Sequence, residues 1–129
     1  MTNQSDVKKI LFVDDDVSLQ NMAKLMLPAM GYDCEIAECG EDAMSLLYEN
    51  PSKYGLVLLD IMMPGISGVE MLEKSQDLVK HYKIPVILQS GLDDPSYFKE
   101  AKSYGSIAFL RKPYSRKDLD GLLKKYYKS

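Results

Sequence analysis

The first apolar run of the chain is Ile10-Leu11-Phe12-Val13, and three consecutive acids, Asp14-Asp15-Asp16, follow it at once. A second run, Leu56-Val57-Leu58-Leu59, is closed by the single acid Asp60. Short runs that are apolar at every position are typical of parallel strands covered on both faces of a sheet. The sequence therefore predicts two buried strands, each with carboxylates at its C-terminal end.

Two further apolar runs end in other polar groups, Ser90 in one case and Lys112-Pro113 in the other. Between the runs, apolar residues recur at three- and four-residue intervals, which indicates helices. Pro28 should kink or end the first helix, and Ser115 should cap the last one. The predicted strands are residues 8–14, 33–37, 56–60, 85–89 and 107–111. The predicted helices are residues 17–30, 40–50, 69–82, 95–104 and a last one after Ser115, with loops at 51–55 and 62–68.

Strands that alternate with helices predict a parallel sheet with right-handed crossovers and helices on both faces. The fold class we expect is α/β, a flavodoxin-like, doubly wound five-stranded parallel sheet with strand order 2-1-3-4-5 and five helices. In that order the first and third strands are neighbours, so the acids that follow them meet at one edge. Ligands bind at this edge in open α/β sheets.

The composition is that of an ordinary globular protein. The chain has 129 residues, of which 46% are hydrophobic and 27% charged, and its net charge is −3. We expect one domain over residues 1–129, with a core from about 7 to 127.

The acidic balance gives no reason to expect direct binding of nucleic acid. No run approaches the ~20 apolar residues that span a bilayer, and residues 1–6 lack signal-peptide character, so we expect no membrane contact and a cytoplasmic location. Cys34 and Cys39 are expected to be small, buried or half-buried side chains without a disulfide.

The three carboxylates predict a divalent cation site. Mg²⁺ prefers oxygen ligands and is usually held by one or two carboxylates, waters and phosphate oxygens, and Mn²⁺ has similar preferences. Asp15 and Asp60 can be direct ligands, with Asp14 reaching the ion through water. Without a cation the carboxylates repel one another, so an empty site should be destabilising and metal binding should raise stability. Asp16 is expected to belong to the start of the next helix instead.

The same groups suit phosphoryl transfer. Asp60 is the natural nucleophile, because attack of its carboxylate on a phosphoryl group gives an acyl phosphate. The transferred group needs its charge neutralised, and Lys112 supplies an ammonium while Ser90 supplies a hydroxyl donor.

These residues give the chain a resemblance to the receiver domains of two-component response regulators, the CheY-like family. The similar segments are Val13-Asp14-Asp15-Asp16, residues 59–68, Ser90-Gly91 and Lys112-Pro113, and the resemblance covers about residues 7–127. Each motif alone is weakly specific, but the set in this order and spacing is highly specific.

The resemblance implies that a sensor histidine kinase phosphorylates Asp60, with Mg²⁺ held by Asp14, Asp15, Asp60 and the backbone carbonyl of Met62. The chain would then be a phosphoacceptor that assists its own phosphorylation and dephosphorylation, and not an enzyme in the usual sense. Its output would be the binding of a downstream effector protein.

The family's switch residues are matched here by Ser90 and Phe109, where Phe109 stands in place of the more common tyrosine. They would remodel the face formed by the fourth helix, fifth strand and fifth helix. The resemblance also allows a phosphorylation-dependent homodimer that forms through this face. The resemblance further implies a cis Lys112-Pro113 bond. Because Met62 and Leu92 are apolar, we expect a phosphorylated lifetime of minutes or longer.

Several alternatives stay open. The chain is either a phosphorelay intermediate that passes its phosphoryl group to a histidine phosphotransferase, or a receiver excised from a larger regulator or hybrid kinase, or a stand-alone regulator. A phosphatase of the haloacid dehalogenase type is disfavoured, because such enzymes carry an aspartate where this chain has Met62. A flavodoxin-like cofactor binder is disfavoured because Asp14-Asp15-Asp16 would repel a phosphate.

Overall fold

The structure of the protein, a computed structural model, describes residues 7–91 and 95–129. In this part of the chain, five parallel strands form one sheet in the order β2-β1-β3-β4-β5, as the sequence predicted. The strands are β1 (Lys9–Val13), β2 (Cys34–Ala37), β3 (Tyr54–Asp60), β4 (Val86–Ser90) and β5 (Ser106–Arg111).

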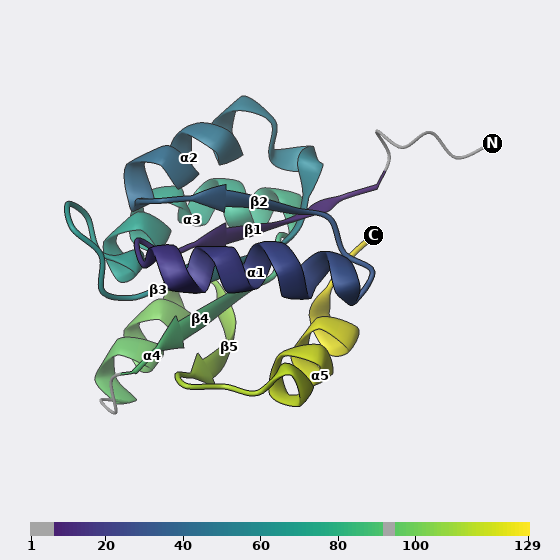
Figure 1. The fold of residues 1–129 in the computed structure, drawn as a ribbon. Helices are drawn as coiled ribbons and strands as arrows, with labels where there is room; N and C mark the ends of the chain where they lie inside the picture. Colours follow the sequence, from purple (N-terminus) through teal and green to yellow (C-terminus); the bar gives the residue numbers. More distant parts are fainter. Residues whose placement is uncertain (1–6, 92–94) are drawn as a thin grey trace.

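Helices cover both faces of the sheet (Figure 1). Helices α1 and α5 pack on one face, and α2, α3 and α4 pack on the other. The helices are α1 (Val17–Ala29), α2 (Gly40–Glu49), α3 (Gly68–Tyr82), α4 (Pro95–Ser103) and α5 (Arg116–Tyr126), with a 3-10 turn, η2 (Pro51–Lys53), before β3. None of these helices has the length and apolar character needed to cross a membrane.

The central strands are buried on both sides, which explains why they are apolar at every position. Along β1, Leu11 and Val13 pack under α2 and α3, whereas Ile10 and Phe12 pack under α1 and α5. All seven residues of β3 are buried. Burial of a large apolar side chain stabilises a fold by about 1.5–3 kcal/mol, so the packing of both layers stabilises the sheet.

Helix starts follow the cap signals in the sequence. Ser67 and Ser115 each form a capping box at the start of α3 and α5. Asp16 caps α1 by accepting hydrogen bonds from the backbone N–H groups of Ser18 and Leu19, so its carboxylate serves the helix as expected. Helix α1 ends at Ala29, one residue after Pro28.

One boundary prediction was wrong. Residues 51–55 were expected to form a loop, but Pro51–Lys53 form a 3-10 turn and β3 already begins at Tyr54. Tyr54 is 2% exposed, and its hydroxyl donates a hydrogen bond to Glu35 on β2. The hydrogen bond between Tyr54 and Glu35 helps to hold Tyr54 in the sheet, where it pairs with Lys9 of β1. The remaining boundaries differ by at most one residue, and the two cysteines are half-buried and unpaired as expected.

Candidate functional site

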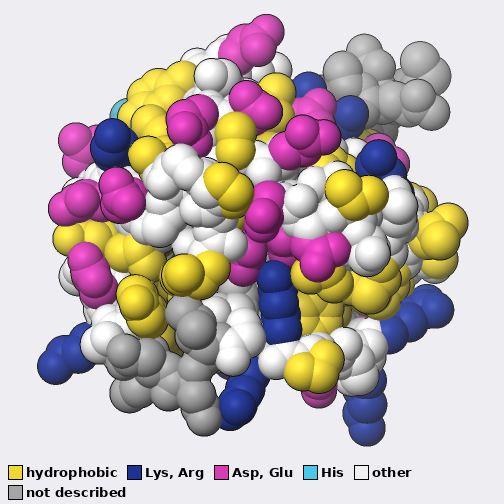
Figure 2. Space-filling view, turned by 60° about the vertical axis from the view of Figure 1, so that its left-hand side comes forward, with side chains coloured by type: hydrophobic (Ala, Val, Ile, Leu, Met, Phe, Trp, Pro, Cys, Tyr) yellow, Lys and Arg dark blue, Asp and Glu magenta, His cyan; other side chains and the backbone are white. Residues whose placement is uncertain are grey.

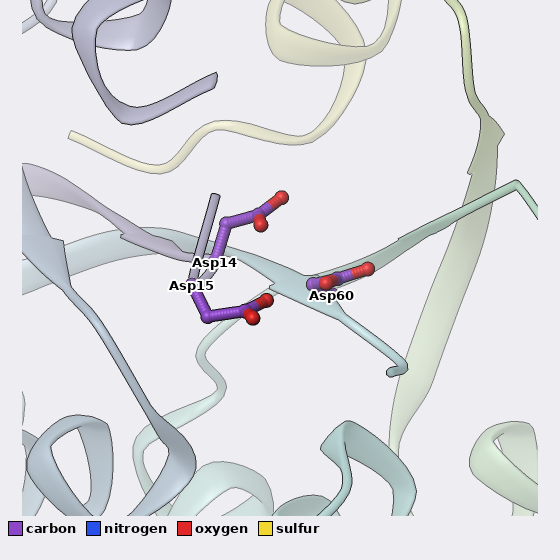
Figure 3. Close-up of side chains that lie close together, drawn as sticks. All are labelled: Asp14, Asp15 and Asp60. Carbon is purple, nitrogen blue, oxygen red and sulfur yellow. The ribbon is translucent and has the colours of Figure 1, made fainter. Parts of the chain in front are cut away.

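The predicted site lies at the C-terminal ends of β1 and β3, which are neighbours in the sheet. Asp14 and Asp15 directly follow β1, and Asp60 is the last residue of β3. The three carboxyl groups extend to the same side, beyond the ends of the two strands (Figure 3). One oxygen from each carboxylate can be chosen so that all three lie within 4.8 Å of one another. The strand order therefore brings together the acids that the sequence predicted would meet.

Lys112 connects two of the three carboxylates. Its Nζ lies 2.7 Å from Oδ2 of Asp14 and 3.1 Å from Oδ1 of Asp60. Lys112 follows β5, and its backbone N–H donates a 2.8 Å hydrogen bond to the carbonyl of Ser90 at the end of β4. The ammonium thus reaches the acids from the β5 side of the sheet, and it converges with them at one edge as the sequence predicted.

Asp14 is held in place by the segment that follows it. It is 1% exposed, and its Oδ1 accepts a 3.0 Å hydrogen bond from the backbone N–H of Asp16. Its own carbonyl accepts a 2.7 Å hydrogen bond from the side-chain amide of Gln20 in α1. Both carboxylate oxygens of Asp14 therefore already accept hydrogen bonds, one from Asp16 and one from Lys112, whereas Asp15 is exposed to solvent.

Burial controls the charge of the site. It raises the pKa of Asp60 to about 6, an effect that Lys112 opposes and that the negative charges of Asp14 and Asp15 reinforce. Burial alone would lower the pKa of Lys112, but its contacts with Asp14 and Asp60 outweigh that effect and raise it. At neutral pH Asp60 is mostly ionised and Lys112 is charged, which is the state that a carboxylate nucleophile and its neutralising cation require.

A glycine brings the start of α3 against the end of β3. The backbone N–H of Gly68 donates a 2.8 Å hydrogen bond to the carbonyl of Ile61. A Cβ atom at Gly68 would lie 2.1 Å from the carbonyl oxygen of Asp60, which is far inside van der Waals contact. A side chain at this position would therefore push the end of β3 away from α3.

The carboxylates fit a hard divalent cation. Three carboxylates that approach within 4.8 Å provide oxygen ligands of the kind that Mg²⁺ and Mn²⁺ prefer. Asp15 and Asp60 are better placed as direct ligands than Asp14, because Asp14 already accepts two hydrogen bonds through its carboxylate. The structure thus contains an acidic cluster that can hold a metal ion.

The other predicted residues lie in β4 or β5, or just after β3 or β5. Ser90 is 2% exposed and ends β4, next to β3. The side chain of Met62 is 58% exposed, just after β3. Phe109, in β5, packs against Phe98 of α4 with ring centroids 5.6 Å apart. Lys112-Pro113 is cis, as the resemblance implied. Leu92 lies outside the described residues.

Two residues that the sequence analysis did not single out also belong to the site. Gln89 is fully buried in β4 beside Asp60, and its Oε1 accepts a 2.8 Å hydrogen bond from the hydroxyl of Tyr114. A polar residue within an otherwise apolar strand was the signal that could have revealed Gln89. Tyr114 could not have been found in that way, because its role depends on the path of the chain after β5.

The site opens onto a mixed surface. Figure 2 shows acidic side chains gathered in the middle of one face, next to a basic side chain with apolar ones beside it. A cleft of about 420 Å³ lies between α1 and the segment after β5. Its lining includes apolar residues of α1 (Leu19 and Met22) and three consecutive residues, Lys112, Pro113 and Tyr114.

Comparison with known proteins gives one consistent result. The response regulator receiver domain family matches residues 10–124. The chain is 36% identical over 118 residues to the 3′,5′-cyclic-nucleotide phosphodiesterase regA of Dictyostelium discoideum, covering 91% of this chain and 14% of that protein. It is 33% identical over 118 residues to the probable transcriptional regulator ycf27 of Cyanophora paradoxa, covering 91% of this chain and 47% of that protein. The chain thus spans less than half the length of each of these curated relatives.

The fold of this chain is also similar to that of a solved receiver domain. The response regulator receiver domain protein (CheY-like) from Methanospirillum hungatei JF-1 superimposes with a TM-score of 0.83 at 30% identity, covering 92% of each chain. The chain therefore belongs to the response regulator receiver domain family.

Proposed function

We propose that Asp60 accepts a phosphoryl group from a sensor histidine kinase and that the chain is a phosphorylation switch in two-component signal transduction. The observation that carries this proposal is the contact of Lys112 Nζ with both Asp14 and Asp60, at 2.7 and 3.1 Å. The contact supports the proposal because a cation beside Asp60 would balance the negative charge that gathers during phosphoryl transfer. Catalysis of such transfer rests on positioning and on charge neutralisation, which these groups supply.

In the proposed reaction, a carboxylate oxygen of Asp60 forms a bond to phosphorus while the bond from phosphorus to the kinase imidazole nitrogen breaks. The imidazole nitrogen keeps the electron pair of that bond, and Asp60 becomes an acyl phosphate. Lys112 balances the charge of the phosphoryl oxygens, and Ser90 donates its hydroxyl to one of them. Because the pKa of Asp60 is about 6, the nucleophile is mostly ionised at neutral pH. The chain assists this exchange on itself and is not a turnover enzyme.

Asp14, Asp15, Asp60 and the backbone carbonyl of Met62 would hold Mg²⁺, with Mn²⁺ as a substitute. When bound, the ion supplies positive charge to the phosphoryl oxygens and relieves the repulsion among the carboxylates. The mutual distance of 4.8 Å or less among the three carboxylates supports this assignment.

The output we propose is protein binding by the face formed by α4, β5 and α5. Phosphorylation would draw Ser90 toward the phosphoryl group and Phe109 inward, which alters the Phe98–Phe109 contact on that face. The partner is an effector protein or a second copy of this chain. We assign the switch to the cytoplasm, where unpaired cysteines such as Cys34 and Cys39 are stable as thiols.

A phosphorelay role is the second candidate. The cleft between α1 and the Lys112-Pro113-Tyr114 segment is partly apolar and adjoins the site. A helical histidine phosphotransferase could place its imidazole there. The chain would then pass its phosphoryl group to that histidine. Transfer of label from the phosphorylated chain to a histidine phosphotransferase domain would separate this role from signalling by a change of shape.

The proposal is tested by intact mass after incubation with acetyl phosphate, with and without Mg²⁺. The wild type should gain one phosphoryl group only with Mg²⁺, and Asp60→Asn should gain none. Asp16→Asn is a matched control, because Asp16 caps α1 and lies outside the cluster, so this variant should be modified like the wild type. An adduct of equal size on Asp60→Asn would refute the assignment of the phosphoacceptor.

A further inference from the structure

Strand β4 contains a buried polar side chain whose presence needs a reason. All five residues of β4 are buried, and Gln89 has an exposed fraction of 0% between Leu88 and Ser90. Burial of an amide is unfavourable unless it is hydrogen-bonded, and an apolar residue would fill this position at lower cost. Stability of the strand therefore does not explain the choice of glutamine.

Gln89 is connected to the segment that carries Lys112. Its Oε1 accepts a 2.8 Å hydrogen bond from the hydroxyl of Tyr114, two residues after Lys112. Burial, together with the negative charges of Asp14 and Asp60, raises the pKa of Tyr114 to about 12, so the hydroxyl stays protonated and able to donate. The backbone N–H of Lys112 is also bound to β4, through the carbonyl of Ser90 at 2.8 Å. Lys112 is thus fixed to β4 at its own backbone and again two residues later.

Gln89 also stands beside the phosphoacceptor. It is the register partner of Asp60 across β3 and β4, and its carbonyl accepts a 3.2 Å hydrogen bond from the backbone N–H of Ile61. Register partners in a parallel sheet project from the same face, and the pair two residues earlier, Leu58 and Ile87, faces α1 and α5. Within the described part of the chain, Nε2 of Gln89 has no hydrogen-bond partner.

We propose that Gln89 and Tyr114 are positioning residues for phosphoryl transfer, because the hydrogen bond between them holds Lys112 in contact with Asp60. This inference rests on the proposed function. Phosphoryl transfer depends on groups that are held in place before the reaction. The lysine side chain is long and flexible, so its ammonium group keeps one position only if the backbone that carries it is fixed. The pair performs this task by tying the Lys112-Pro113-Tyr114 segment to the strand next to Asp60.

The test compares Tyr114→Phe, Gln89→Met and the double variant in phosphorylation by acetyl phosphate over a Mg²⁺ titration. Each single variant loses the same hydrogen bond, so each should lower the maximal rate about fivefold, the effect of one neutral hydrogen bond. The double variant should also lose about fivefold, because the two changes share one interaction. The Mg²⁺ concentration for half-maximal rate should stay within about twofold, since the three carboxylates are untouched.

Tyr127→Phe is the control for a purely structural role. The hydroxyl of Tyr127 donates a 2.6 Å hydrogen bond to the carbonyl of Lys8, before the start of β1 and away from the acids. Its loss should lower thermal stability by an amount similar to Tyr114→Phe but leave the phosphorylation rate at the wild-type value. Wild-type rates in both Tyr114→Phe and Gln89→Met, an equal slowing in Tyr127→Phe, or multiplied losses in the double variant would each overturn the inference. A wild type that gains no phosphoryl group would instead refute the proposed function, and the inference with it.

Discussion

Replacement of Asp60 by Asn should make the metal-free protein more stable at neutral pH, although it removes the proposed phosphoacceptor. Asp60 is 5% exposed, and burial is the largest cause of its raised pKa. The positive charge of Lys112 lowers the pKa of Asp60 and so opposes the effect of burial, while the negative charges of Asp14 and Asp15 raise it further. The resulting pKa is about 6, against an ordinary value of 3.8. The ionised side chain is therefore less favourable in the folded protein than in the unfolded chain.

The contribution of Asp60 to the free energy of unfolding follows from its pKa in the folded protein and its ordinary pKa in the unfolded chain. Because the folded-state value is the higher one, Asp60 contributes no penalty below about pH 4, a growing penalty between about pH 4 and 6, and its full penalty above that window. This rise in the pKa of Asp60 corresponds to about 3 kcal/mol in the free energy of unfolding. This value already includes the favourable contact with Lys112.

Urea denaturation in the presence of a chelator would measure the effect. At about pH 7.5, Asp60→Asn should unfold with a free energy about 2–3 kcal/mol higher than the wild type, and the two should agree near pH 4. Asp16→Asn should match the wild type, because asparagine caps a helix as well as aspartate does. If Asp60→Asn were no more stable than the wild type at pH 7.5, the reasoning from burial and charge would be wrong.

Three further predictions follow from the same site. Lys112→Met leaves Asp14 and Asp60 without their shared cation, so it should lower the free energy of unfolding in chelator by about 3 kcal/mol; a loss under about 1 kcal/mol would contradict the ion pairs. Mg²⁺ at about a hundredfold excess over its dissociation constant should stabilise the wild type by about 2.7 kcal/mol in thermal unfolding, and Asp15→Asn by much less at the same concentration; equal gains would exclude Asp15 as a ligand. Gly68→Ala forces a Cβ against the carbonyl of Asp60 and should cost about 1–3 kcal/mol in urea unfolding. Gly121→Ala meets nothing within 4 Å and serves as its control, so equal effects of the two would refute the steric argument.

The strands and their order could be predicted because the information is local. Runs such as Leu56-Val57-Leu58-Leu59 are apolar at every position because both sides of the strand are buried, and the alternation with helices restricts the topology to few choices. The meeting of Asp14, Asp15 and Asp60 follows from that topology alone, since the acids close two strands that become neighbours. The same reasoning places Lys112 at the same edge.

The remaining features depend on contacts between distant segments. Tyr54 was expected to lie in a loop, because nothing in its neighbourhood shows that its hydroxyl meets Glu35 on β2. The role of Asp16 was predictable because a helix cap has a local signature, whereas the contact of Asp14 with Lys112 joins residues far apart in the sequence. The hydrogen bond from Tyr114 to Gln89 requires the path of the chain after β5, which no local pattern encodes.

The most direct test of the central claim is to locate the phosphorylated residue. The protein would be incubated with Mg²⁺ and acetyl phosphate, reduced with borohydride, digested, and mapped by tandem mass spectrometry. Borohydride converts an aspartyl phosphate to homoserine, and we expect homoserine at position 60 alone, only when Mg²⁺ was present. Homoserine at position 14 or 15, or its absence from position 60 in a protein that had gained a phosphoryl group, would contradict this expectation.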